Sequence, residues 1–224
     1  MIYSNLVLIL FILINLFFLI NFSKIKIFNL NIDNPDNKRK LHSKPTPLAG
    51  GQLIFFNILL YWLIYTFADA FLDKEVFFED IKSFNYFMLI STCIFLLGFT
   101  DDRINLKANL KFLIMILLIF FLLLLDKNII INEITFSFYQ KKISLDEFAI
   151  FFSIFCFLVF INAFNMFDGI NLQSGIYSLL ILISILVFYS NSLLIKILII
   201  SLIFFLYLNF KNKTFLGDSG SLLI

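Results

Sequence analysis

Long runs without a charged side chain constrain this sequence more than any other feature. The first run, residues 1–22, matches the roughly 20 apolar residues that a helix needs to cross a bilayer core of about 30 Å. With 61% hydrophobic and 14% charged residues, the chain has more apolar surface than a soluble domain of its size buries. Lipid is therefore the expected solvent. Because no basic segment or small-residue cleavage site accompanies the first run, we expect it to be retained as a helix.

The apolar runs predict an all-α, polytopic membrane helix bundle with about seven transmembrane spans, in which residues 1–224 form a single domain. Polar residues at 189–192 divide the longest run into two helices. After the first, the predicted spans are 51–68, 84–100, 108–125, 148–165 and the two halves of 170–210. Alternating apolar and polar residues over 131–138 predict a short strand or hairpin between two spans.

The basic residues predict the orientation of the chain. If the spans simply alternate, eleven of the 17 Lys and Arg residues fall on one side of the membrane and five on the other. The positive-inside rule then places the N-terminus outside and the polar segments 29–51, 101–107, 167–169 and 211–224 on the cytoplasmic side of the inner, or plasma, membrane. The net charge of +2 is too small to indicate a nucleic-acid partner, so none is expected.

Two adjacent carboxylates, Asp101 and Asp102, stand at the cytoplasmic end of the third predicted span. They either cap the helix at the membrane interface, or bind a hard cation or accept a proton from a nucleophile. Lys111 follows one turn inside the next span. It either neutralises a phosphate group or extends its amine to the interface, as single lysines near helix ends commonly do. These residues alone leave both alternatives open.

The end of the fifth span carries amides and a carboxylate. A helical period places Asn162, Asn165 and approximately Asp168 on one face. An unpaired polar group in hydrocarbon costs several kcal/mol, which favours a polar cavity or a bound ligand, with hydrogen bonds between helices as the alternative. Further on, glycines flank Asp218 in the string 217–221 and allow close backbone approach to a ligand, although such strings also form ordinary turns.

The first cytoplasmic loop, 33–51, holds all three prolines and a run of cations that includes Lys40, together with the only histidine, His42. Such a loop suits anionic head groups or phosphates, and a loop that only sets topology is the alternative. Hydropathy and Lys placement do not depend on these motifs, yet they predict that all four polar segments lie on the same side. Together they suit Mg²⁺-assisted phosphoryl transfer between a nucleotide and a lipid.

In order and spacing, these segments resemble the polyprenyl-phosphate N-acetylhexosamine-1-phosphate transferases of glycosyltransferase family 4. That family includes undecaprenyl-phosphate GlcNAc-1-phosphate transferases and the peptidoglycan phospho-MurNAc-pentapeptide translocase. The matching strings are 39–47 with 50–51, 98–102, 162–169 and 217–221. The resemblance implies transfer of N-acetylhexosamine 1-phosphate from UDP-N-acetylhexosamine to undecaprenyl phosphate, with release of UMP, as the first step of lipid-linked surface glycan synthesis such as lipopolysaccharide.

The resemblance also implies roles for individual residues. The implied catalytic residues are Asp101, Asp102, Lys111 and Asp168. The implied substrate-binding residues are Lys40, His42, Asn162 and Asn171. The implied metal ligands are Asn165 and Asp218, for Mg²⁺ with Mn²⁺ as an alternative. In this assignment the two adjacent aspartates jointly position or deprotonate the lipid phosphate, Lys111 contacts the diphosphate and Asn171 reads uracil.

The sequence departs from the family pattern in two places. After 168–171 the common continuation Gly-Leu-Ala is replaced by Leu-Gln-Ser-Gly. The family pattern also continues beyond 217–221 with further helices and a loop that recognises the sugar nucleotide, whereas this sequence stops at Ile224. We therefore expect a C-terminally short member of undetermined sugar specificity. A homodimer stays open, as do two other functions: a truncated inactive relative, and a small membrane transporter or lipid-binding protein.

Overall fold

A computed structural model describes residues 2–35, 44–68, 72, 78, 80–136, 138–189 and 191–224. The long helices are α1 (Ile2–Asn21), α2 (Gly50–Ala68), α3 (Ile81–Ile104), α4 (Ala108–Leu125), α5 (Ala149–Phe167), α6 (Gln173–Phe188) and α7 (Leu193–Phe210). Among the described residues, six helices are long and apolar enough to cross a membrane, and α6, with 16 residues, is the shorter seventh. The predicted all-α, polytopic membrane bundle is therefore confirmed, and the chain is a multi-pass membrane protein.

Local sequence explains where the long helix α3 begins and ends. At the start of α3, the Asp80 side chain accepts a hydrogen bond from the Ser83 N–H at 2.8 Å, which is an N-cap. At its end, Asn105 adopts a left-handed conformation with φ +49° and donates its N–H to the Asp101 carbonyl. Asp101 and Asp102 therefore lie in the last turn of a long membrane helix.

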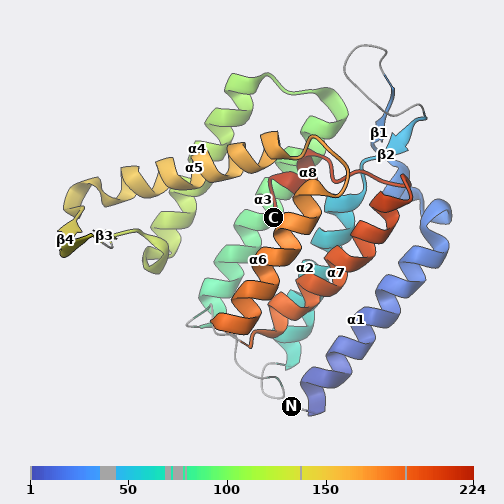
Figure 1. Cartoon of the computed structure of the whole chain (residues 1–224), viewed down its shortest axis with the longest axis horizontal. Coiled ribbons are helices and arrows are strands. Elements are labelled where there is room, and N and C mark those ends of the chain that lie inside the picture. The colour runs from blue at the N-terminus through green and yellow to red at the C-terminus, as the bar shows by residue number, and fades with distance from the viewer. Residues whose placement is uncertain are drawn as a thin grey trace.

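Five helices, α1, α2, α3, α6 and α7, lie side by side as a bundle (Figure 1). Helix α7 contacts α1, α2 and α6, and its Ile197, Leu202 and Leu208 side chains are buried. A fully buried pair of amides joins α1 to α2, because Asn15 Nδ2 donates to Asn57 Oδ1 at 2.7 Å. Paired amides avoid the cost of unpaired polar groups within an apolar bundle.

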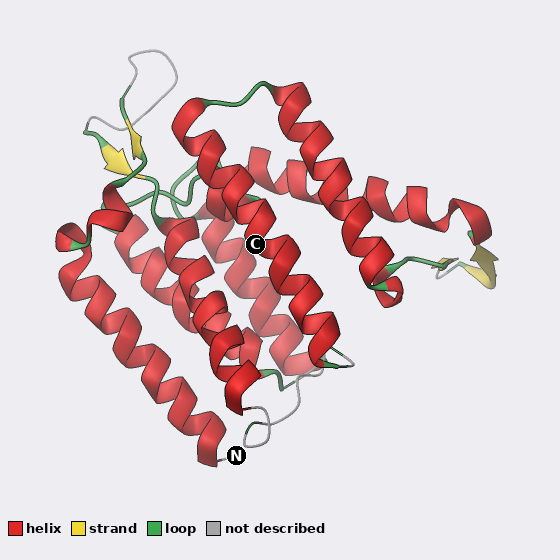
Figure 2. Ribbon diagram, turned by 180° about the vertical axis from the view of Figure 1, so that it is seen from behind, coloured by secondary structure: helices red, strands yellow, loops and turns green. Residues whose placement is uncertain are grey.

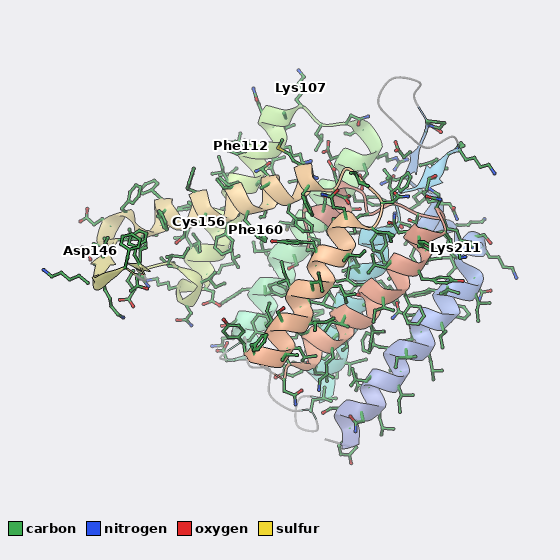
Figure 3. The ribbon with its side chains drawn as sticks, viewed as in Figure 1. Lys107, Phe112, Asp146, Cys156, Phe160 and Lys211 are labelled. Carbon is green, nitrogen blue, oxygen red and sulfur yellow. The ribbon has the colours of Figure 1, made fainter. Side chains whose placement is uncertain are left out.

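Helices α4 and α5 project to one side of this bundle (Figures 1 and 2). At the far end of the projection, β3 (Glu133–Phe136) pairs antiparallel with β4 (Tyr139–Ser144), and Lys142 forms an ion pair with Glu133. This confirms the predicted strand or hairpin. Figure 3 shows Lys107, next to the start of α4, and Asp146, before α5, at opposite ends of the projection. The end near Lys107, where α4 begins and α5 finishes, adjoins the short helix α8 (Asp218–Ser221).

A second small sheet lies at the start of α2. Strand β1 (Ile32–Asp33) pairs antiparallel with β2 (Thr46–Pro47), and Leu48 forms a parallel bridge with Phe215. The segment that follows β2 is therefore hydrogen-bonded to the segment that precedes α8. Lys40 and His42, which the sequence analysis assigned to substrate binding, lie outside the described residues.

Candidate active site

The short helix α8 is held against glycines of α2 and α3. A Cβ atom on Gly98 would lie 2.5 Å from the Asp218 carbonyl oxygen, and one on Gly51 would lie 2.3 Å from the Gly220 nitrogen. Gly217, directly before α8, has φ +73°, a conformation that glycine adopts without steric cost. Small residues therefore let the backbone of α8 touch two membrane helices, which places Asp218 among the helix ends.

Asp102 holds the beginning of α8. Its Oδ1 accepts a hydrogen bond from the Asp218 N–H at 2.7 Å, and its Oδ2 accepts one from the Ser219 N–H at 3.1 Å. A Cβ atom on Gly217 would lie 2.8 Å from the same carboxylate. Charge-assisted bonds to backbone N–H groups are stronger than neutral ones, so Asp102 is placed to orient Asp218.

Lys111 joins two carboxylates that lie far apart in the sequence. Its Nζ lies 2.7 Å from Asp101 Oδ2 and 2.6 Å from Asp218 Oδ2. The other oxygen of Asp101 accepts the Leu106 N–H at 2.6 Å, which secures the connection between α3 and α4. Only 10% of the Asp101 side chain and 14% of the Lys111 side chain are exposed, so solvent screens this ion pair weakly.

Asn165, in the last turn of α5, completes the cluster. Its Nδ2 donates to Asp218 Oδ1 at 2.9 Å and to Ser221 Oγ at 2.6 Å. Burial raises the pKa of the Asp218 carboxyl, but hydrogen bonds with the Asp101, Lys111 and Asn165 side chains outweigh burial and lower the pKa below its ordinary value. Asp218 is therefore ionised at neutral pH.

The cluster offers a donor set that fits a hard cation. The carboxylates of Asp101 and Asp218 and the amide carbonyl of Asn165 are the oxygen ligands that Mg²⁺ prefers. The Lys111 ammonium between the two carboxylates shows that this position stabilises positive charge. In the part of the chain that the structure describes, no three His, Cys, Asp or Glu side chains are grouped to hold a metal.

Asp168 lies beyond the end of α5 and accepts a hydrogen bond from the Ser174 hydroxyl in the first turn of α6. Burial raises the pKa of the Asp168 carboxyl to about 6, although the hydrogen bond from Ser174 lowers it, and the negative charge of Asp218 adds to the rise. Asp168 is therefore close enough to Asp218 to sense its negative charge.

The structure brings some of the predicted site residues together and leaves others apart. The hydrogen-bonded cluster contains Asp101, Asp102, Lys111, Asn165 and Asp218. Within it the two adjacent aspartates have different partners. Asp101 contacts Lys111, and Asp102 contacts the backbone of α8. Two predicted residues bond elsewhere: Asn162 donates to the Leu158 carbonyl of its own helix, and the exposed Asn171 donates to Asn212 Oδ1.

Sequence reasoning missed Asn209, Thr214 and Ser174, which form hydrogen bonds with the connections next to α2, α6 and α8. Asn209 is 3% exposed and Thr214 is 1% exposed, and each bonds to a neighbouring loop. A signal for Asn209 was present, because it is an amide at the end of a mostly apolar span, where polar side chains are costly unless paired.

Comparison with known proteins identifies the family to which this site belongs. The family model described as glycosyl transferase family 4 matches residues 84–224, which include every residue of the cluster. The chain belongs to glycosyl transferase family 4. The family assigned from the sequence motifs is thus confirmed.

Several curated relatives of this glycosyl transferase family 4 chain are transferases. The chain is 30% identical over 194 residues to the undecaprenyl-phosphate alpha-N-acetylglucosaminyl 1-phosphate transferase of Thermotoga maritima, an alignment that covers 86% of this chain and 53% of the relative. It is 26% identical over 206 residues to the phospho-N-acetylmuramoyl-pentapeptide-transferase of Listeria monocytogenes, covering 84% of this chain and 61% of the relative. The chain thus spans between half and two thirds of the length of these relatives.

Proposed function

We propose that this chain transfers N-acetylhexosamine 1-phosphate from a UDP-sugar to undecaprenyl phosphate at the cytoplasmic face of the inner membrane, releasing UMP. The observation that carries the proposal is the cluster in which Lys111 lies within 2.7 Å of both Asp101 and Asp218 at the ends of membrane helices. Membership of glycosyl transferase family 4 and relatives that bear the names of two such transferases support the same reaction.

In the proposed reaction a phosphate oxygen of the lipid attacks the β-phosphorus of the UDP-sugar. A new phosphorus–oxygen bond forms, and the bond from the β-phosphorus to the bridging oxygen breaks. The bridging oxygen leaves with the α-phosphate as part of UMP, and the lipid keeps a diphosphate-linked sugar. Because negative charge concentrates around the transferred group, positioning and electrostatic stabilisation are the main work of the protein.

The residues divide this work according to their contacts. Asp218 and Asn165, with Asp101 beside them, would hold Mg²⁺, which neutralises phosphate charge when bound. Lys111 already lies between two carboxylates and would turn its ammonium to the diphosphate. Asp102 keeps Asp218 in place through the backbone of α8. We assign the positioning of the lipid phosphate, and the removal of any proton that it carries, to Asp101 and Asp102 jointly.

Two loop residues complete the proposed site. Asp168, which senses the charge of Asp218, would act in its ionised form. Asn171 is exposed and bonded through its amide to Asn212, so it lies on a surface that a uracil base could reach. Amide groups suit this task because they both donate and accept hydrogen bonds, as the edge of uracil does.

Release of UMP tests the proposal directly. The purified chain, reconstituted in lipid, is incubated with UDP-GlcNAc and undecaprenyl phosphate, with and without Mg²⁺, and UMP and lipid-linked sugar are measured. The Thermotoga maritima relative serves as the control for the assay. We expect UMP release that needs both the lipid phosphate and Mg²⁺. If the relative is active and this chain forms no product with any UDP-N-acetylhexosamine, the proposed function is wrong for this chain.

A further inference from the structure

Asn209 contacts two loops at once from the last turn of α7. Its Oδ1 accepts a hydrogen bond from the Leu172 N–H at 2.7 Å, in the connection between α5 and α6. Its Nδ2 donates to the Thr214 carbonyl at 2.8 Å, in the connection between α7 and α8. Both functional groups of one buried amide are therefore used, each by a different loop.

The contact at Thr214 extends to a third segment. The Thr214 hydroxyl accepts the Ala49 N–H and donates to the Pro47 carbonyl, each at 3.0 Å. Next to it, the Phe215 N–H donates to the same Pro47 carbonyl at 2.9 Å. The start of α2, whose Gly51 contacts α8, is thus attached to the loop that Asn209 holds.

The backbone at Leu172 shows why such a contact is needed. Leu172 has φ +70°, a left-handed conformation that is strained for a residue other than glycine. The hydrogen bond to Asn209 is made by the N–H of this same residue. It therefore stabilises the turn that leads from Asp168 and Asn171 into α6.

We infer that Asn209 is a positioning residue, which fixes the loop that carries Asp168 and Asn171 to the loop that leads into Asp218. It does not touch the reacting groups and acts through Leu172 and Thr214. The consequence for turnover rests on the proposed function. The mechanical coupling of the two loops does not, and it can be measured without any activity.

Hydrogen exchange measured by mass spectrometry tests the coupling in the full chain reconstituted in lipid. Asn209→Leu removes both hydrogen bonds while keeping a side chain of similar size. We expect exchange to become about two- to tenfold faster in residues 168–176 and in residues 211–217 together, which corresponds to the loss of typical hydrogen bonds. The matched control is Asn57→Leu, which removes a fully buried amide from α2 and should leave both loops unchanged.

A second variant separates positioning from general loss of packing. In Asn209→Asp, the protonated carboxyl can accept from the Leu172 N–H and donate to the Thr214 carbonyl, whereas the ionised carboxylate lacks a donor. Loop exchange, expressed relative to the native protein at each pH, should therefore approach the native rate as pH falls. Three results would each overturn the inference: acceleration in only one loop, acceleration spread equally over all helices, or accelerated exchange in Asn209→Asp that does not slow as pH falls.

Activity then links the coupling to the proposed function. With UMP release as the assay, Asn209→Leu should lower kcat at least tenfold, and Asn209→Asp should regain kcat at low pH in parallel with its loop exchange. If the native protein releases no UMP, the proposed function fails while the exchange result still decides the coupling. If exchange responds as expected but kcat of an active protein does not change, Asn209 has no positioning role in the reaction.

Discussion

Gly98→Ala is the substitution that tests most directly how the site is assembled. The added Cβ atom would lie 2.5 Å from the Asp218 carbonyl oxygen and 2.6 Å from the Ser219 Cα atom. Since ordinary contacts between carbon atoms are about 3.5–4.0 Å, α8 has to retreat from α3 by roughly 1 Å. That shift lengthens the hydrogen bonds of 2.7 Å and 3.1 Å from α8 to Asp102, and the contact of 2.6 Å between Lys111 and Asp218.

Two quantities should change. Overpacking of this kind costs about 1–3 kcal/mol, so the thermal midpoint of the reconstituted protein should fall. A misplacement of about 1 Å in a catalytic group can lower turnover by about 100-fold, so kcat for UMP release should fall by that order. The matched control is Gly169→Ala, because a Cβ atom there meets nothing within 4 Å and φ at this position is not left-handed. A native midpoint and native kcat in Gly98→Ala, or equal losses in both variants, would refute the reasoning.

Three further predictions concern the charges of the site. Asp218→Asn removes charge without changing shape, so turnover should be abolished while the protein remains membrane-inserted and folded; unchanged UMP release would contradict the metal assignment. Lys111→Met removes the ammonium between Asp101 and Asp218. Mg²⁺ should therefore raise the thermal midpoint of this variant more than that of the native protein, and equal shifts in a melting assay would count against a shared cation position. The ionised form of Asp168 exists above its pKa of about 6, so activity should rise as pH increases through about 6. Ser174→Ala removes the bond that lowers this pKa and should move the rise to higher pH, and a pH–rate profile with an unmoved acidic limb would exclude Asp168 as its source.

Hydropathy predicted the membrane helices closely. The span predicted at 108–125 coincides with α4, and the polar residues at 189–192 do separate α6 from α7. The reason is physical, because a chain in lipid satisfies its backbone groups within each helix and a span therefore needs only length and apolar composition. The hairpin β3–β4 was predicted by the same kind of local pattern, alternation with a period of two.

The site was predicted less completely. The sequence placed Asp101, Asp102, Lys111, Asn165 and Asp218 at the same side of the membrane, and the structure joins them through hydrogen bonds. The sequence could not distinguish the two adjacent aspartates. Neighbours on a helix point about 100° apart, and which direction faces Lys111 and which faces α8 depends on how α3 is packed.

The sequence by itself determined that the helices lie in lipid, how many apolar spans there are, and at which end of the bundle charged residues gather. It could do so because hydropathy and charge are local properties of the chain. Only the tertiary structure decided that Asp102 holds α8, that Gly98 and Gly51 let α8 approach, and that Asn209 joins two loops. Most of these contacts link residues far apart in the chain, such as Asp102 with Ser219 and Asn209 with Leu172. No local pattern specifies them, because a glycine or an amide looks the same in sequence whether its partner is solvent, lipid or another helix.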